Sequence, residues 1–539
     1  MADHGPPPSS AAPSGPSGPL GGFGFPISGP AATLGALPAS VPYHPYLLAA
    51  GLAVLFLFWL QPLSSSSTSK FPHLNPRKPL ELTETRRKQE FVINSGAMLD
   101  AWFREHPNQP ARVIGDAGEV IVLPPHLTNE LRNDPRLSFA GWINFHAHIP
   151  GFEGFREGSR DSQIVQEVIM KDLTKYLNKI TEPLSEETAL AVNELYPADN
   201  DQEWHTISPR ERLLRLVARV SSRVFLGEEI CRNEAWLRVT REYTVDAFGA
   251  AEELRLWPAP LRALVHWFLP SCRRARADVA EARHIIGAVL DKRRLQKQRG
   301  EKVEYDDAID WFEREARGRE YDPTVAQLTL SMAAIHTTTE LVTQVMSDIA
   351  QDPDILDELR HEMVQVLRDG GWKKTSLYNM KLLDSVLKES LRLKPTGIIS
   401  MRRLASDNIR FSDGTSIPKG SMVAVTARNH WDAGVYEKPE AWDGRRFLRM
   451  RETAGREHVA QMVSTAPDYL SFGHGQHACP GRFFAANEAK VILIHLLLKY
   501  DWRLSPDAPR PRIRHYGWTL RADPTTTMQY RRRRPEIDL

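Results

Sequence analysis

The sequence has few cysteines, almost no net charge and no internal repeat over residues 80–539. Its three cysteines, Cys231, Cys272 and Cys479, are too few and too widely spaced for a disulfide framework, which fits a reducing compartment. The formal net charge of +2 gives no argument for nucleic-acid binding. The one dense basic run, Arg531 to Arg534, is expected to be a solvated tail.

Composition divides the chain into four parts. Residues 1–42 are rich in Pro, Gly, Ser and Ala with almost no charge, which predicts disorder. Residues 43–63 are apolar over a length that can cross a bilayer as one helix. A proline-rich linker, residues 64–79, precedes a globular catalytic domain over residues 80–539.

A cleaved signal peptide is the competing interpretation of residues 43–63. No basic segment precedes this stretch, and no small-residue cleavage pattern follows it. Tyr46 and Trp59, near its two ends, suit the interfaces of a membrane. Basic residues on its C-terminal side place the catalytic domain in the cytosol. We therefore expect a single-pass protein of the endoplasmic reticulum membrane.

The globular part is predicted to be mainly helical with small β-sheets. The segment from Val113 to Leu123, interrupted by two glycines, predicts a β-hairpin. Apolar periodicity predicts helices over residues 213–226, 234–248, 277–299, 322–351, 355–368 and 378–393. Strand-like pieces follow at residues 409–411, 423–425 and 518–520. The expected fold class is therefore α+β, mainly α.

A ten-residue loop places one thiol just before an apolar helix that begins at Arg482. The thiolate of Cys479 is a strong electron donor and is suited to hold a heme iron from one side. A buried structural cysteine is the ordinary alternative. The spacing of the whole loop, Phe472-Gly-His-Gly-Gln-His-Ala-Cys-Pro-Gly481, favours the iron ligand.

Four neighbours of Cys479 in this loop have predicted roles around a heme. Gly475 and Gly481 would let the backbone come close to the flat macrocycle and turn its amides toward the sulfur. Phe472 would shield the sulfur, and His477 could reach a propionate of the heme. We expect these residues to form the cofactor-binding loop.

The helix predicted over residues 322–351 is the second informative element. Asp322 and Pro323 begin it and Pro353 lies beyond its end, which brackets about 30 residues, or about 45 Å. Apolar residues cover much of its circumference, so we expect it to be buried. Three consecutive threonines from Thr337 weaken its middle, because their hydroxyls compete for carbonyl groups one turn back. The pattern predicts either a functional opening of the helix or ordinary back-bonding of these hydroxyls.

Glu389 and Arg392 lie at positions i and i+3 of the last predicted helix, where they could form a surface ion pair. Apolar neighbours favour a buried pair, which would need further hydrogen-bond partners. Arg446 is the candidate for such a partner.

Together these residues resemble the cytochrome P-450 superfamily of heme-thiolate monooxygenases, over about residues 75–530. The resemblance implies a helical fold around one long central helix, with heme b as the cofactor. It makes Cys479 the axial iron ligand, Thr337 the threonine of oxygen activation, and Ala333 its neighbour at the oxygen site. It also assigns to the cofactor-binding set Glu389, Arg392, Arg446, Arg402 and Arg403.

Three positions depart from the pattern of that family. His336 stands where a carboxylic acid commonly precedes the threonine, so the catalytic set includes His336 while the identity of the proton donor is open. His477 stands where an arginine is commoner, which gives a weaker, titratable contact to a propionate. The chain lacks a Trp-x-x-x-Arg sequence before the first substrate loops, and Lys171 or Lys175 would replace its arginine.

The resemblance implies a monooxygenase that inserts one oxygen atom of O2 into a hydrophobic small molecule. The chain has no flavin or nicotinamide fingerprint. Electrons from NADPH would therefore come through a separate NADPH–cytochrome P-450 reductase, with cytochrome b5 as a second donor. Arg445, Arg449 and Arg451 could supply positive charge for docking that partner, or form an ordinary solvated face.

A fungal subgroup of the family shares further motifs with the chain. The segments Ala333 to Thr338, Ser221 to Gly227 and Ser400 to Ala405 are similar to it. Members of that subgroup commonly oxidise terpenoid skeletons. The implied substrate is therefore a terpenoid or meroterpenoid intermediate of fungal secondary metabolite biosynthesis. Candidate substrate contacts are residues 396–400, 333–337 and 139–155.

Three other functions stay open. A heme-thiolate enzyme of a redox-neutral rearrangement, dehydration or ring closure would keep Cys479 without external electrons, and the intact Thr337 argues mildly against it. A heme sensor without enzymatic activity would need a signalling surface, and the sequence shows none. A zinc protein using His474, His477 and Cys479 lacks a fourth ligand at a useful spacing.

Overall fold

The computed structural model describes residue 51 and residues 70–81, 83–144, 151–157, 163–197, 203–257 and 259–539. All elements named below lie in one compact unit within residues 59–539. The predicted disordered segment, nearly all of the predicted anchor and much of the predicted linker lie outside the described residues. No helix of the described ranges is both long and apolar enough to span a bilayer.

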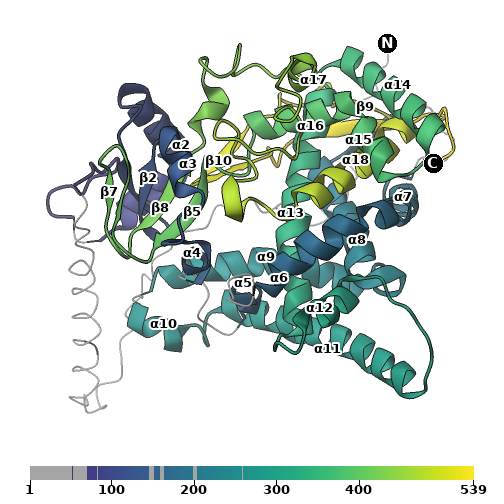
Figure 1. Ribbon diagram of the computed structural model, residues 1–539, viewed down its shortest axis with the longest axis horizontal. Coiled ribbons are helices and arrows are strands. Elements are labelled where there is room, and N and C mark those ends of the chain that lie inside the picture. The colour runs from purple at the N-terminus through teal and green to yellow at the C-terminus, as the bar shows by residue number, and fades with distance from the viewer. Residues whose placement is uncertain are drawn as a thin grey trace, which may run out of the picture. The chain divides into compact units, whose positions relative to one another are not determined.

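Helices dominate the described chain (Figure 1). The longer helices are α2 (Thr85–Glu105), α7 (Thr174–Leu195), α8 (Pro209–Ile230), α9 (Glu234–Arg255), α11 (Pro270–Gln298), α13 (Pro323–Ile349), α14 (Pro353–Gly370), α16 (Lys381–Leu393) and α18 (Arg482–Lys499). The shorter helices are α3 (Thr128–Leu131), α4 (Phe139–Asn144), α5 (Glu153–Glu157), α6 (Ile164–Val168), α10 (Ala259–Val265), α12 (Ala308–Ala316), α15 (Lys374–Asn379) and α17 (Arg446–Glu452). Single turns are η2 (Pro125–Leu127), η3 (Ile169–Leu173), η4 (Arg428–Trp431) and η5 (Gly475–His477).

The described strands form small sheets beside the helices, which confirms an α+β fold that is mainly α. The strands are β1 (Ala111–Gly115), β2 (Gly118–Leu123), β3 (Leu137–Ser138), β4 (His205–Ile207), β5 (Ile399–Ala405), β6 (Ile409–Arg410), β7 (Ser416–Ile417), β8 (Met422–Thr426), β9 (Tyr500–Leu504), β10 (Arg514–Tyr516), β11 (Thr519–Arg521) and β12 (Met528–Arg532). The largest sheet has the order β1-β2-β8-β5-β3, with β2 and β8 parallel. The others are β4-β12-β9, β10-β11 and β6-β7. The predicted hairpin is confirmed by the antiparallel pairing of β1 with β2.

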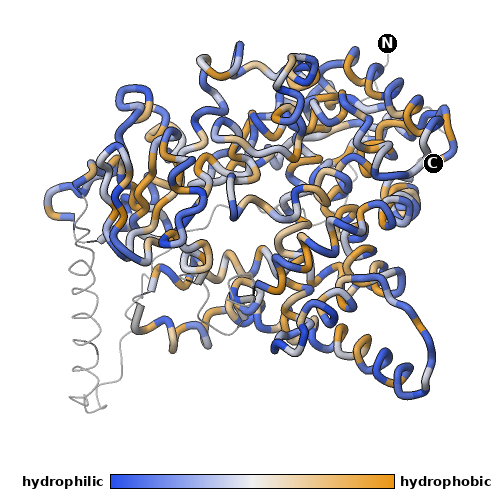
Figure 2. The backbone as a smooth tube through the Cα atoms, viewed as in Figure 1, coloured by the Kyte–Doolittle hydropathy of each residue, from blue (hydrophilic) through white to orange (hydrophobic). Residues whose placement is uncertain are grey.

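Helix α13 confirms the predicted long buried helix. Asp322 caps its first turn by accepting hydrogen bonds from the backbone N–H groups of Thr324 and Val325, at 3.0 and 3.2 Å. Pro323 lies in the first turn, where its missing N–H removes no helical bond. The helix packs against α8, α9, α16 and α18, and both α13 and α18 are largely apolar in Figure 2.

The middle of α13 shows back-bonding rather than an opening. The helix is continuous from Pro323 to Ile349. The Thr337 hydroxyl donates to the carbonyl of Ala333 at 2.7 Å, and other threonine hydroxyls of this helix bond one turn back in the same way. Of the two predicted alternatives, the functional opening is therefore wrong, because the Thr337 and Thr339 hydroxyls find carbonyl acceptors one turn back without displacing the helical hydrogen bonds.

Two further predictions of elements need correction. The helix predicted over residues 378–393 is two helices, because Met380 leaves the helical backbone with φ −75° and ψ 80°. The Glu362 carboxylate then caps the start of α16 by accepting from two backbone N–H groups, at 2.7 and 2.9 Å. The basic run at 531–534 is not a solvated tail, because it begins inside β12, and Arg531 and Arg533 form ion pairs with Asp501.

Candidate functional site

Hydrogen bonds hold the loop of Cys479 at both ends. The Cys479 N–H donates to the carbonyl of Phe472 at 2.8 Å, and the Gly473 N–H donates to the carbonyl of Leu470 at 2.9 Å. Arg482, the first residue of α18, donates from Nη1 to the Cys479 carbonyl at 2.8 Å. The sulfur is thereby kept at the N-terminus of α18, where backbone N–H groups favour negative charge.

The two predicted glycines of this loop have different structural reasons. Gly475 has φ 81°, and a Cβ added there would lie 2.5 Å from the Cβ of Arg132, so only glycine fits. Among the described atoms, a Cβ added at Gly481 would meet only the Ile169 side chain, at 4.0 Å. The backbone at Gly481 therefore leaves open space beside the loop.

The Cys479 thiol needs a cation to become a thiolate. Burial raises the pKa of this thiol above its ordinary range, although the N–H groups of Gly481 and Arg482 lower it. A thiol with a raised pKa keeps its proton at neutral pH, and a coordinated metal ion would replace that proton. The loop therefore suits a metal centre that brings its own positive charge.

Ala333 and Thr337 form an exposed surface on α13. Both are exposed, whereas most of this helix is buried. They lie one turn apart on one face of the helix, so a methyl group and a hydroxyl stand side by side. A flat ligand could pack here and receive one polar contact.

Arg403 is a buried cation with unused hydrogen-bond donors. It is 2 % exposed, and its Nε and Nη2 have no partner among the described residues. Its Nη1 donates to the carbonyl of Arg402 at 2.7 Å. Burial lowers the pKa of Arg403 to about 10, so the guanidinium stays charged near neutral pH. Because a buried, uncompensated charge is costly, this position fits the carboxylate of a bound ligand.

A β-bulge sets the direction of Arg403. Between Ser400 and Arg403, β5 carries one more residue than β8, and Met401 has φ 52°. Such bulges re-aim side chains and occur beside active sites. The guanidinium of Arg403 lies 5.6 Å from the ring centre of Phe139, which lies 6.3 Å from the ring of His477. The structure thus brings together two of the predicted cofactor-binding residues, Arg403 and His477, of which His477 was the predicted propionate contact.

Arg402 points elsewhere than its neighbour. Its guanidinium lies 5.9 Å from the ring centre of Trp142. The two arginines therefore occupy different surroundings, and Arg403 has the better geometry for a ligand carboxylate.

The predicted network of Glu389, Arg392 and Arg446 is present and buried. Glu389 and Arg392 are both 0 % exposed. The Arg392 guanidinium donates to both carboxylate oxygens of Glu389 at 2.8 and 2.9 Å, and Arg446 Nε donates to Oε1 at 3.1 Å. Two arginines around one carboxylate, with further backbone carbonyl acceptors, satisfy the charges that burial would otherwise penalise.

His430 links this network to the Cys479 loop, and the sequence analysis missed it. Its Nδ1 bonds to the carbonyl of Arg392 at 3.0 Å, and its Nε2 accepts from the backbone N–H of Leu470 at 2.8 Å. Burial lowers the pKa of His430 to about 3, so the ring is neutral with its proton on Nδ1. A lone histidine outside any motif gave no signal that could have found it.

His336 lies on another side of α13 from Thr337. Successive residues of a helix are turned by about 100°, and the His336 Nε2 bonds to the carbonyl of Arg241 on α9 at 2.9 Å. Burial lowers the pKa of His336 to about 4, so the ring is neutral at physiological pH. The structure does not bring His336 to the surface of Ala333 and Thr337.

The other predicted basic contacts are engaged in ion pairs or lie exposed. Lys171 pairs with Glu167 and Glu315, each at 3.2 Å, and Lys175 is exposed on α7. The three arginines proposed for docking a redox partner also pair with carboxylates. These pairs are Arg445 with Glu358, Arg449 with Asp443, and Arg451 with Asp384.

The predicted substrate contacts are divided between core and surface. Ile398 and Ile399 are buried in the core around Trp518, whereas Thr396 is exposed. Residues 145–150 of the predicted 139–155 segment lie outside the described residues. The exposed members of these segments that the structure describes include Phe139, Ala333 and Thr337.

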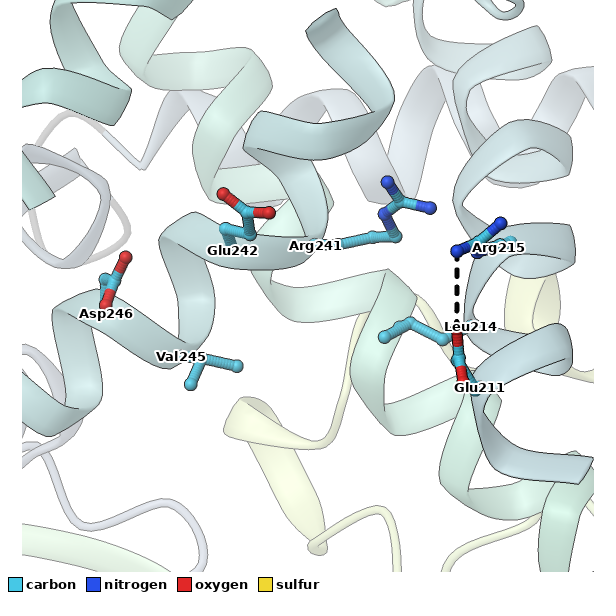
Figure 3. A pocket seen from close by; sticks show the side chains of 7 residues that line it. All are labelled: Glu211, Leu214, Arg215, Arg241, Glu242, Val245 and Asp246. Carbon is cyan, nitrogen blue, oxygen red and sulfur yellow. Dashed lines mark hydrogen bonds and ion pairs between the residues drawn. The ribbon is translucent and has the colours of Figure 1, made fainter. Parts of the chain in front are cut away.

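A separate surface hollow lies between α8 and α9 (Figure 3). Its lining residues are Glu211, Leu214, Arg215, Arg241, Glu242, Val245 and Asp246. Glu211 and Arg215 form an ion pair across one turn of α8, at 3.3 Å. Its charged lining does not suit an apolar substrate, and it contains none of the predicted site residues.

The zinc interpretation finds no support in the geometry. His474 is bonded through both ring nitrogens, to Arg132 and Thr465, each at 3.1 Å. In the described ranges, no three His, Cys, Asp or Glu side chains are grouped to hold a metal ion. The structure instead offers the one thiol of Cys479 in its loop, and a heme iron can be held by a single cysteine thiolate.

Comparisons with known proteins agree with this geometry. The family model described as cytochrome P-450 matches residues 155–527. The cytochrome P-450 monooxygenase hepE of Aspergillus oryzae is 49 % identical, over 86 % of each chain. The cytochrome P-450 monooxygenase 1 of Gibberella fujikuroi is also 49 % identical, over 80 % of this chain and 99 % of its own. The crystal structure of the P450DA heme domain has the same fold, with a TM-score of 0.64 at 17 % identity over 86 % of this chain and 98 % of that chain.

Proposed function

The chain belongs to the cytochrome P-450 family, and from that premise we propose that it oxidises a terpenoid or meroterpenoid intermediate of fungal secondary metabolism. It is an oxidoreductase, a cytochrome P-450 monooxygenase. The observation that carries the proposal is the single thiol of Cys479 at the start of α18, together with the uncompensated cation of Arg403 and the exposed face of α13.

Heme b fits these residues. Cys479 would hold its iron through the thiolate, and Arg403 with His477 would hold its propionates. The bound heme supplies the oxidation, in which one atom of O2 enters the substrate and the other leaves as water, with two electrons and two protons consumed.

During that oxidation, the side chains of this protein would move protons and would hold the Cys479 loop in place. The Thr337 hydroxyl can rotate from the Ala333 carbonyl and donate its proton toward the exposed face of α13. Hydrogen bonds run from Glu389 through Arg392 and His430 to Leu470, and they fix the chain just before the Cys479 loop begins. A loop held from several sides keeps the sulfur in one position as the substrate binds.

The electron supply and the location are part of the proposal. NADPH would deliver electrons through a separate reductase, since the sequence has no flavin or nicotinamide fingerprint. The apolar residues 43–63 would anchor the enzyme in the endoplasmic reticulum membrane, with the catalytic part in the cytosol. The fungal sources of the relatives and the shared motifs support a fungal metabolite as substrate.

Expression with a reductase in a host that accumulates terpenoids tests this function. The reduced, carbon-monoxide-treated protein should show the absorption of a thiolate-bound heme, and Cys479→Ala should abolish it. Product masses should gain oxygen from labelled O2 in an NADPH-dependent reaction. Conversion without NADPH or O2 would replace the monooxygenase with the redox-neutral alternative.

A further inference from the structure

Helix α5 packs on the side of α13 that carries Ala333 and Thr337. The Thr329 hydroxyl shares its proton between the Gly154 carbonyl of α5, at 3.0 Å, and the Val325 carbonyl of its own helix, at 2.8 Å. Thr329, Ala333 and Thr337 follow at intervals of four residues, so they lie on one side of α13. Helix α5 therefore covers the turn that precedes the two exposed residues.

A buried tyrosine of α9 holds the start of α5. Tyr243 is 1 % exposed. Its hydroxyl accepts a hydrogen bond from the Gly154 N–H at 3.1 Å and donates to the Gly151 carbonyl at 3.2 Å. The hydroxyl thus links a carbonyl and an N–H three residues apart, which in a simple turn bond directly to each other. Burial raises the pKa of Tyr243 far above its ordinary value, so the hydroxyl keeps the proton that it donates.

Two glycines let the neighbouring helices come close to this turn. A Cβ added at Gly154 would lie 3.0 Å from the Tyr243 hydroxyl oxygen. Gly151 has φ 100°, and a Cβ added there would lie 3.1 Å from the Arg276 side chain of α11. Gly154 is bonded on both sides, through its N–H to Tyr243 and through its carbonyl to Thr329. Side chains from α9 and α13 therefore fix α5 at one residue.

The residue after Gly154 forms an aromatic wall with α9. Phe155 on α5 meets Phe248 on α9 edge to face, with ring centres 4.8 Å apart and 86° between the ring planes. This geometry is one that aromatic pairs prefer. Phe155 is buried, whereas Phe248 is 48 % exposed. The hydrogen bonds at Gly154 set the position of the Phe155 ring, because the two residues are adjacent in one short helix.

We propose that Tyr243 is a positioning residue for the substrate, because its hydroxyl, together with that of Thr329, holds the aromatic wall of Phe155 and Phe248 beside the exposed turns of α13. Neither hydroxyl touches the substrate. The wall suits a bulky hydrophobic molecule that spreads over these turns, since apolar and aromatic side chains line most sites for such ligands. A small molecule bound at the heme iron does not need it. This inference rests on the monooxygenase function proposed above.

Two imidazoles that bind a heme iron through nitrogen test the wall in the heme-loaded protein. Clotrimazole carries three aromatic rings that require space beside the iron, whereas imidazole carries none. Tyr243→Phe keeps the ring and removes two hydrogen bonds, so the Kd of clotrimazole should rise about tenfold. Thr329→Val removes the bond on the other side of Gly154 and should act in the same direction. The Kd of imidazole should stay unchanged in both variants.

Tyr530→Phe and Thr343→Val are the matched controls. Tyr530 is also buried and donates to the Pro197 carbonyl at 3.0 Å, but it lies in β12. The Thr343 hydroxyl donates within α13, to the Thr339 carbonyl at 2.7 Å. Both controls should leave both dissociation constants unchanged. A rise in the Kd of clotrimazole in the controls as large as in Tyr243→Phe would mean a general loss of stability and would overturn the proposal.

Amide hydrogen exchange gives a second readout that needs no ligand. A peptide over residues 152–157 should exchange faster in Tyr243→Phe than in the wild type, while the exchange of α18 stays the same. With a terpenoid that the wild type converts, KM should rise in Tyr243→Phe and kcat should change little, because the reacting groups are untouched.

The outcomes separate the wall from the function. An unchanged Kd of clotrimazole in Tyr243→Phe, or an equal rise in the Kd of imidazole, overturns the positioning role. If Tyr243→Phe does not fold, the comparison of Thr329→Val with Thr343→Val decides in the same way. A wild type that binds heme without the thiolate spectrum would instead overturn the proposed function.

Discussion

At the residue scale, the site is marked by side chains whose local surroundings do not satisfy them. Arg403 is charged, buried and short of acceptors among the described residues. Cys479 is a thiol whose burial opposes ionisation although α18 starts beside it. Each of these groups is unfavourable alone and becomes favourable with a ligand that carries a metal cation and carboxylates.

Arg403→Met should separate two effects of this buried charge, namely its destabilisation of the heme-free protein and its contribution to heme binding. Methionine removes the buried charge and keeps most of the volume, so the heme-free protein should be equally or more stable. Heme affinity should fall by about 100-fold or more, since removing one partner of a buried charge pair costs about 3–5 kcal/mol. Urea unfolding of the heme-free protein and heme transfer to apomyoglobin measure the two effects. Destabilisation of the heme-free protein with unchanged heme transfer would mean that Arg403 only supports the fold.

Sequence alone could predict the residues that motifs fix relative to one another in the chain. The Cys479 loop, the pair of Glu389 and Arg392, and the helix around Thr337 were found in this way. His430 could not be found, because its importance comes from residues distant in the chain that fold against it. Burial and lost solvation are properties of the fold and leave no local pattern.

At the element scale, a buried ion pair connects α16 with α17, and hydrogen bonds of His430 connect α16 with the Cys479 loop. Glu389 on α16 accepts a hydrogen bond from Arg446 on α17. His430 bonds both to the carbonyl of Arg392 and to the N–H of Leu470, which precedes the loop. The sequence predicted the ends of α13 well because Asp322 and Pro323 are local signals. It joined α15 and α16 because the break at Met380 depends on the distant carboxylate of Glu362.

Arg446→Met should weaken this connection between elements. It leaves the buried Glu389 with one arginine, so the free energy of unfolding should fall by about 3–5 kcal/mol, and heme should be lost more readily. Arg445→Met is the neighbouring control, because Arg445 pairs with Glu358 at the surface and such pairs contribute at most about 1 kcal/mol. Urea unfolding followed by tryptophan fluorescence compares them. Equal losses in the two variants would contradict a special role for the buried network.

At the scale of the whole molecule, the described part is a mainly helical unit with its own core. The largest hydrophobic cluster joins side chains from α7, α8, α9, α13, α16 and α18. The site is built from this unit, since Cys479, Thr337 and Arg403 all lie within residues 70–539. Membrane attachment, by contrast, is predicted from the hydropathy of residues 43–63 alone.

Removal of residues 1–69 should therefore separate catalysis from attachment. The shortened chain should keep the thiolate-bound carbon monoxide spectrum, because every residue placed in the site remains. The full chain should resist extraction of membranes by alkaline carbonate, and the shortened chain should be released. A full-length variant with Leu55→Lys and Phe56→Lys is the matched control, since each lysine at the centre of a spanning helix costs about 2.5–3.5 kcal/mol. Release of the unaltered full chain would show that residues 43–63 do not anchor it, and the site would stand unaffected.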